Sequence, residues 1–431
     1  IVSGDVVKGS TARIAAGQCT ANMKPSQFTG SKRCLQALLL AGMGLALLST
    51  ALQAAPRTPA QDAEVLERLP FRAGDTTARE LSVLRAAVAQ APTDPQPAAA
   101  LAHRYFDLAI AKGDPRYVGY ADALVSRFST SMPPDLLVLR GMVRQYRHDF
   151  QAALDDFASA LAQDPDLAGA HAWRGAIYLV QADYASAAKE CEALQRLQRA
   201  VLHGGCAGLT LAYTGHLDAA YKTLQLALAA ASDPGHRLWL NTRLGEVAAW
   251  QGLPDVAQRH YRQALALDID DGYLLAAWSD FLLDQGRPAE VVQLLTRWEA
   301  SDGLLLRLAE AETLLKLPAA AAHVQALDDR FAAARLRGDT THQAEEARYE
   351  LRLRQNARQA VTLAAANYRV QKEPRDARIL LETAWAAQDR PAARAALDWL
   401  HSSGFEGVEL RRLARQFATP VAAASSPGAA K

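Results

Sequence analysis

The chain has 431 residues, half of them apolar, and its 47 basic and 46 acidic side chains give a formal net charge of +1. A balance this close to neutral argues against a protein that coats nucleic acid or binds an anionic membrane surface, because both roles need a basic face. Alanine is frequent, as in QAALDDFASALAQ at 151–163, and the alternating pattern of half-buried strands is nearly missing. Alanine is the strongest helix former, so we expect an all-α protein.

The first 55 residues have the pattern of an export signal preceded by an extension. Residues 1–22 show no clear periodicity, and we interpret them as an upstream, non-native extension before a start at Met23. Residues 23–55 combine basic side chains, the apolar run 35–48 and small residues, which is typical of a cleaved signal peptide. The run is shorter than the roughly 20 residues of a membrane span. We therefore expect a periplasmic bacterial protein with no membrane span after signal cleavage, and an uncleaved N-terminal membrane anchor is the alternative.

A repeated unit follows the signal. Residues 57–96 predict N-terminal capping helices, and residues 97–133 predict a divergent helix pair. Five similar units then occupy residues 134–303. A small residue marks the first helix of each unit at spacings of 34, 33, 37 and 34: Gly141, Gly175, Gly208, Gly245 and Ser279. The packing positions that follow are an alanine twelve residues later in the first four units, with bulky aromatics after two of them: Ala153, Ala187, Ala220, Ala257, Phe157 and Tyr261.

This pattern resembles the tetratricopeptide repeat (TPR), a helix-turn-helix unit of 34 residues. The resemblance covers roughly residues 97–400 and is closest in the five units. It implies an α-solenoid, a right-handed superhelix of stacked helix pairs. One pair cannot bury its apolar face alone, so successive units must pack on each other. Residues 304–417 predict degenerate TPR-like helices, and residues 418–431 predict a disordered tail.

The resemblance also implies where a partner would bind. In TPR proteins the first helices of successive units line a concave groove that holds peptides or partner proteins. Carried over unit by unit, it places five aromatic and three acidic residues in this groove: Tyr146, Tyr213, Trp239, Trp250, Tyr273, Glu246, Asp280 and Asp284. Tyrosine and tryptophan are common anchors of interfaces. The alternative is that these aromatics pack between helices, and we expect that role for Trp173 and Trp278.

Motifs of enzymes and cofactor sites are incomplete in this chain. Ser186 and Lys189 match the S-x-x-K of penicillin-binding enzymes, but no Ser-Asp-Asn or Lys-Thr-Gly motif accompanies them. The acidic run 268–272 lacks the ligand spacing of a calcium loop, and the glycine-rich run 203–208 follows no strand. No two histidines have metal-ligand spacing on one helix face. We therefore expect no catalytic, cofactor or metal site.

Cys191 and Cys206 are the two cysteines of the expected mature chain. One lies in the second helix of its unit and the other early in the first helix of the next unit. Neighbouring antiparallel helices can bring such positions within the range of a disulfide, which an oxidising compartment favours. A buried pair of free thiols is the alternative, and either role is structural.

These observations favour a non-enzymatic periplasmic scaffold that binds a protein or peptide in its groove and supports assembly of an envelope or secreted complex. The alternative is a glycan-binding TPR module of an exopolysaccharide synthesis or export system. A glycan site predicts aromatic rings with open faces beside carboxylates. A peptide site predicts apolar pockets between helices and a continuous groove.

Overall fold

The computed structural model describes residue 61 and residues 75–128 and 132–418. The expected extension, signal peptide, first capping helix and C-terminal tail lie outside these residues. Every helix of the described part belongs to one compact unit, Ala73–Lys431.

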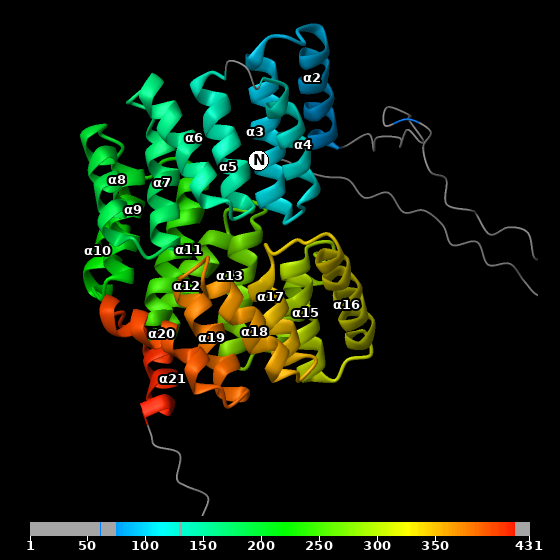
Figure 1. Cartoon of the computed structure of the whole chain (residues 1–431), viewed down its shortest axis with the longest axis vertical. Helices are drawn as coiled ribbons and strands as arrows, with labels where there is room; N and C mark the ends of the chain where they lie inside the picture. Colours follow the sequence, from blue (N-terminus) through cyan, green and yellow to red (C-terminus); the bar gives the residue numbers. More distant parts are fainter. Residues whose placement is uncertain (1–60, 62–74, 129–131, 419–431) are drawn as a thin grey trace, which may run out of the picture. The chain divides into compact units, whose positions relative to one another are not determined.

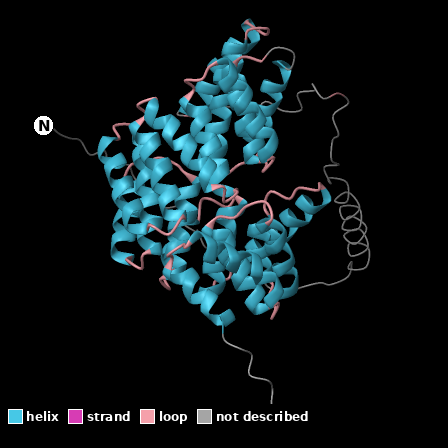
Figure 2. Cartoon of the chain, turned by 60° about the vertical axis from the view of Figure 1, so that its left-hand side comes forward, coloured by secondary structure: helices cyan, strands magenta, loops and turns pink. Residues whose placement is uncertain are grey.

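The described residues form helices and no strand (Figure 2). There are twenty α-helices, and a short 3-10 turn, Ser126–Phe128, follows α4. In chain order the helices are α2 (Thr76–Gln90), α3 (Pro95–Lys112), α4 (Arg116–Val125), α5 (Pro134–Tyr146), α6 (Phe150–Gln163), α7 (Ala168–Val180), α8 (Tyr184–Arg196), α9 (Ala200–Tyr213), α10 (Leu217–Ala230), α11 (Pro234–Trp250), α12 (Pro254–Leu265), α13 (Gly272–Asp284), α14 (Pro288–Leu295), α15 (Asp302–Leu315), α16 (Ala320–Leu336), α17 (Gln343–Arg352), α18 (Ala357–Tyr368), α19 (Pro374–Ala386), α20 (Arg390–Ser403) and α21 (Val408–Ala418).

Consecutive helices pair through short turns, as Figure 1 shows from α5 onward. The five units with the clearest motif are the pairs α5/α6 to α13/α14, and α15 to α20 supply three more pairs. Proline stands at the start of several of these helices, where its missing N–H costs no hydrogen bond. The expected all-α solenoid of stacked helix pairs is confirmed.

The small residues of the first helices leave room for large side chains of the second helices. A Cβ atom on Gly141 would lie 2.6 Å from the ring of Phe157, and one on Gly245 would lie 2.9 Å from the ring of Tyr261. The ring centre of Tyr261 lies 5.4 Å from that of Trp278 in the next unit, so Trp278 packs as expected. The alanines of the second helices are fully buried at these crossings: Ala153, Ala187, Ala220 and Ala257. Close approach of the two helices therefore depends on residues without a large side chain.

The C-terminal helices pack back onto earlier units instead of only extending the row. One hydrophobic cluster contains Leu209 of α9, Leu244 of α11, Leu380 of α19 and Phe417 of α21. Hydrogen bonds cross the same boundary, such as the one from the Lys372 backbone N–H to the carbonyl oxygen of Val180, at 2.7 Å. Helices α17 to α21 thus contribute to the core of the central units.

Candidate partner-binding surface

The structure corrects the expected exposure of Tyr213. Its side chain is only 3% exposed, and its hydroxyl donates a hydrogen bond of 3.1 Å to Glu373 Oε1, just before α19. Burial raises its pKa well above the usual range. Tyr213 does lie on a first helix, α9, but the C-terminal helices cover that face. It is therefore a core residue and no groove anchor.

Trp250 belongs to the same core, in a closed circuit of five aromatic residues. Tyr213 lies between Tyr184 and Trp250, with ring centres 6.4 and 5.9 Å apart. Phe405 lies between Trp250 and Trp399, each at 5.4 Å. The Trp399 indole N–H closes the circuit by donating to the hydroxyl of Tyr184 at 2.7 Å. For Tyr213 and Trp250, packing between helices is therefore the correct interpretation, and this circuit ties α8, α9 and α11 to α20.

Trp239 and Tyr146 also pack against neighbouring helices. The Trp239 ring occupies the space that a side chain on Gly205 of α9 would need. The Tyr146 ring centre lies 6.4 Å from that of Phe106, which also contacts Trp173 at 6.0 Å. Burial raises the pKa of Tyr146 to about 12. Trp173 packs as expected, and Tyr146 and Trp239 are half-buried side chains that contact neighbouring helices.

Tyr273 and Glu246 meet in a polar cluster between α11 and α13. The Tyr273 hydroxyl donates to Glu246 Oε1 and accepts from Arg243 Nη1, both at 2.5 Å. Arg243 also pairs with Glu246 at 2.8 Å, and its guanidinium lies 4.3 Å from the Tyr273 ring centre. Arg375 of α19 lies 5.7 Å from the same ring. The sequence pattern brought Tyr273 and Glu246 to one face, but it did not identify their arginine partners.

The two predicted aspartates of α13 are paired with arginines of later helices. Asp280 accepts hydrogen bonds from Arg307 at 2.7 Å and from Arg348 at 2.6 Å. Burial opposes ionisation of Asp280, but these two guanidinium groups hold its pKa well below the usual range. Asp284 binds Arg378 through both carboxylate oxygens, at 2.6 and 2.7 Å. Two parallel bonds of this kind fix the geometry of the pair and are stronger than neutral hydrogen bonds.

Part of this region remains open to solvent, and we call it the charged strip: Asp280, Asp284, Arg348, Arg375 and Arg378. The exposed fractions of these side chains run from 20% for Arg348 to 57% for Arg375. Asp284 is 41% exposed and Arg378 is 31% exposed. The strip lies where α13 meets α17 and α19. Its partly exposed side chains are within reach of a partner.

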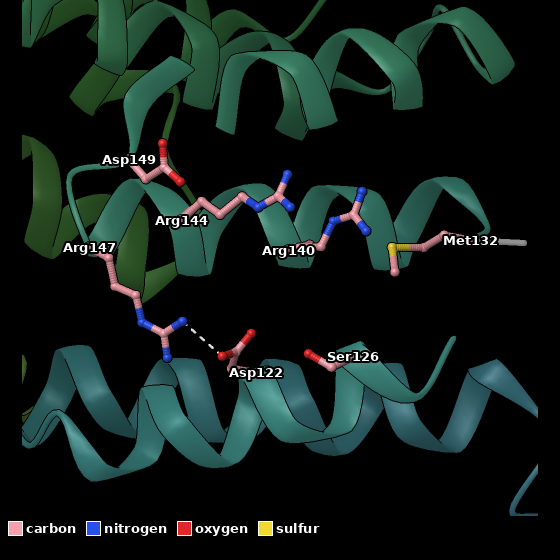
Figure 3. A pocket seen from close by; sticks show the side chains of 7 residues that line it. All are labelled: Asp122, Ser126, Met132, Arg140, Arg144, Arg147 and Asp149. Carbon is pink, nitrogen blue, oxygen red and sulfur yellow. Dashed lines mark hydrogen bonds and ion pairs between the residues drawn. The ribbon is translucent and has the colours of Figure 1, made fainter. Parts of the chain in front are cut away.

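A separate hollow of about 330 Å³ lies between α4 and α5, beside Asp122 and Ser126 (Figure 3). Its three arginines, Arg140, Arg144 and Arg147, look like an anion site. Arg140 and Arg144 bind the buried Asp156 at 2.6 and 2.7 Å, however, and Arg147 binds Asp122 at 2.8 Å. Each arginine is thus bound to an aspartate of the fold, and Arg140 and Arg144 share one carboxylate.

The cysteine pair, the Ser186 motif and the acidic run 268–272 each take part in the structure of the helices and turns. Cys191 and Cys206 form a disulfide between α8 and α9, with Cα atoms 5.5 Å apart. The backbone N–H of Ser186 donates to the capping carboxylate of Asp183 at 3.1 Å, and the run 268–272 forms the turn before α13. Within residues 75–128 and 132–418, no three His, Cys, Asp or Glu side chains are arranged to hold a metal ion. None of the helices in these ranges is both long and apolar enough for a membrane span.

Comparison with known proteins adds structural neighbours only. No family model matches the chain, and no curated protein matches it. Among solved structures, it is similar to a tetratricopeptide repeat protein from Parabacteroides merdae ATCC 43184, with 13% identity, a TM-score of 0.38, and coverage of 54% of this chain and 91% of the other. It is also similar to the APC/C hetero-tetramer Cut9-Hcn1, with 13% identity, a TM-score of 0.47 and coverage of 80% and 67%. Yeast Tom70 matches at 12% identity, with a TM-score of 0.42 and coverage of 79% and 85%. The resemblance of this chain to the tetratricopeptide repeat thus rests on its own helix pairs and anchor contacts.

Proposed function

We propose that this chain is a non-enzymatic scaffold that binds a protein or peptide partner through the charged strip. The observation that carries the proposal is the partial exposure of Asp284, Arg375 and Arg378 on an otherwise packed inner face. Ion pairs that are half-exposed keep unsatisfied hydrogen-bonding capacity on their solvent side. A partner segment bearing charges of both signs can use this capacity, and complementary charge mainly confers specificity and a fast association rate.

The burial of the predicted aromatic residues favours a protein partner over a glycan. A sugar ring stacks on an aromatic ring with an open face, but Tyr213 and Trp250 are faced by other rings. Tyr273 lies beside two guanidinium groups. The packing of Tyr213, Trp250 and Tyr273 therefore supports a protein partner rather than a glycan.

The proposed site of action is the bacterial periplasm, in support of an envelope or secreted complex. The Cys191–Cys206 disulfide supports this location, because such bonds persist in oxidising compartments and are rare in the cytosol. Cell fractionation, with thiol alkylation before reduction, tests it. We expect the protein in the periplasmic fraction with both thiols blocked. A cytosolic protein with two reactive thiols would contradict the proposed location.

A charge exchange tests the partner site and keeps an attraction between α13 and α19. It also removes the contact of 2.8 Å between Arg378 and Glu382, so the thermal midpoint of each variant is measured beside its binding. In the double variant Asp284→Arg/Arg378→Asp, the two side chains can still attract each other, but the field they present to a partner is reversed. The matched control exchanges an exposed pair of the first described helices, Glu80→Arg on α2 and Arg104→Glu on α3, whose side chains are 48% and 28% exposed. Circular dichroism establishes that both variants are as helical as the wild type.

The binding measurement is affinity capture from an envelope extract, followed by titration with the purified partner. We expect capture by the wild type and the control, and a loss of at least about tenfold in affinity for the strip exchange, since a change of about 1.4 kcal/mol is tenfold. Binding should also weaken as salt is added. Equal binding by all three proteins would place the interface elsewhere. No specific partner for the wild type would contradict the scaffold role.

A further inference from the structure

A second hollow, of about 710 Å³, lies among the turn between α7 and α8, the end of α18, and helices α19 and α20. We call it the aromatic pocket; Tyr184, Tyr368, Trp399, Arg369 and Lys372 are among the residues that line it. Its volume is within the range of roughly 300–1,000 Å³ typical of small-ligand sites. It is distinct from the charged strip, which lies where α13 meets α17 and α19.

The walls of the aromatic pocket are apolar and held in place. Trp399 and Tyr184 are members of the aromatic circuit, and their mutual hydrogen bond fixes both rings. Alanine and leucine side chains of α18 to α20, such as Ala365 and Leu380, complete the walls. A pocket built from such constrained side chains loses little conformational entropy when a ligand enters.

The two tyrosine hydroxyls of this pocket have protons to donate. Tyr368 is only 3% exposed, and its hydroxyl has no hydrogen-bond partner among the described residues. Leaving a buried polar group unpaired costs about 1–3 kcal/mol, so native proteins rarely do so without a reason. The hydroxyl of Tyr184 accepts from Trp399, which leaves its own proton available. Burial raises the pKa of Tyr368, so this hydroxyl keeps its proton and remains a donor at neutral pH.

The charge of the aromatic pocket has one sign. Arg369 and Lys372 supply two cations, and no acidic residue of the described part lines the pocket. Neither side chain forms an ion pair or hydrogen bond with a described residue. The hollow beside α4 differs, because each of its arginines is bound to an aspartate. Of these two hollows, the aromatic pocket is thus the one that offers unpaired cations next to apolar walls.

We propose that the aromatic pocket binds a carboxylate joined to an apolar body. The body packs against the rings of Tyr184, Tyr368 and Trp399, and Arg369 and Lys372 attract the carboxylate. Two sources supply this chemistry, a free organic acid and the C-terminal residue of a peptide. The proposal does not depend on the charged strip, and it stands whether or not a partner binds there.

Titration calorimetry on the full chain tests the proposal with paired probes. The first pair is 3-phenylpropionate and its neutral amide, and the second is an acetylated tetrapeptide ending in phenylalanine with a free or an amidated C-terminus. We expect each bound acid to bind at least about tenfold more tightly than its amide. Tighter binding of the small acid alone identifies a free acid as the ligand, and tighter binding of the peptide acid identifies a C-terminus.

Two variants link the binding to this pocket. Lys372→Met keeps the aliphatic stem and removes the charge, so it should weaken binding of the acid about tenfold and leave the amide unaffected. Tyr368→Phe removes only the unpaired hydroxyl, so it should weaken binding about threefold or more without lowering the thermal midpoint. Lys222→Met, at an exposed position of α10, is the control and should bind as the wild type. The proposal is overturned if neither acid binds more tightly than its amide, or if Lys372→Met binds both forms like the wild type.

Discussion

Replacing Gly215 by alanine tests whether the loop after α20 packs against the central units. Gly215 forms the turn between α9 and α10 with φ of +81°, and a Cβ atom there would lie 2.5 Å from the carbonyl oxygen of Gly404. Gly286 forms the corresponding turn between α13 and α14 with φ of +67°, and no atom lies within 4 Å of the position of its Cβ. The two glycines share the backbone conformation and differ in the contact. Gly286→Ala is therefore a matched control.

The expected magnitudes follow from these two geometries. An alanine in the left-handed region costs about 1 kcal/mol, and both variants bear that cost. In Gly215→Ala the new methyl group also clashes with the backbone at Gly404, which must move to make room. Overpacking of this kind costs about 1–3 kcal/mol more. We expect the free energy of unfolding to fall by about 1 kcal/mol for Gly286→Ala and by about 2–4 kcal/mol for Gly215→Ala.

Urea denaturation followed by circular dichroism measures the two losses. Hydrogen exchange then locates them, because displacement of the loop should raise the exchange rate in α21 (Val408–Ala418) only for Gly215→Ala. Equal losses for the two variants, with no change of exchange in α21, would refute the contact between the turn and the loop.

Three further changes have defined outcomes. The Cys191–Cys206 disulfide closes a loop with a sequence separation of 15, and a loop of this length stabilises the fold by about 3 kcal/mol. Replacing both cysteines by serine should therefore lower the free energy of unfolding by about this amount. A reductant should cause the same loss in the wild type and no loss in the variant. Burial lowers the pKa of His148 to about 4. Between pH 6.5 and pH 4 the unfolded chain therefore binds a proton that the folded chain does not, and the free energy of unfolding decreases as the pH is lowered through this window. His148→Asn, which tolerates the φ of 61°, should make this fall in the urea midpoint smaller. Arg348→Met leaves the buried Glu310 without its partner and should cost about 3–5 kcal/mol in denaturant titration, whereas replacing both residues by apolar ones should cost less.

The packing within and between neighbouring helix pairs was predictable from the sequence, because the residues in contact lie close together along the chain. The period of small residues placed Gly141 and Gly245 against the aromatic side chain sixteen positions later, and proline at helix starts such as Pro254 marked the turns. The cysteine pair was also within reach, because its members lie on neighbouring helices of consecutive units. In each case the partners are separated by fewer residues than one repeat contains.

The exposure of the inner face was not predictable in this way. The residue that covers Tyr213 is Glu373, 160 positions further on, and the partner of Asp284 is Arg378, 94 positions further on. No periodic pattern indicates which late helix returns to which early one. A tyrosine on the inner face of a first helix therefore has the same sequence signature whether it binds a partner or is buried by the chain itself.

The contacts between the last helices and the central units make the stability of the central units depend on the C-terminal end of the chain. In an array where each repeat contacts only its neighbours, terminal units can be removed one at a time with stepwise losses. Here Trp250 faces Phe405, so truncation before residue 405 exposes an aromatic core in the middle of the row. The same ring stays uncovered in any chain whose last helices have not yet folded. The final segments thus act as a closing element, and unfolding of the central units should be coupled to them in one cooperative step.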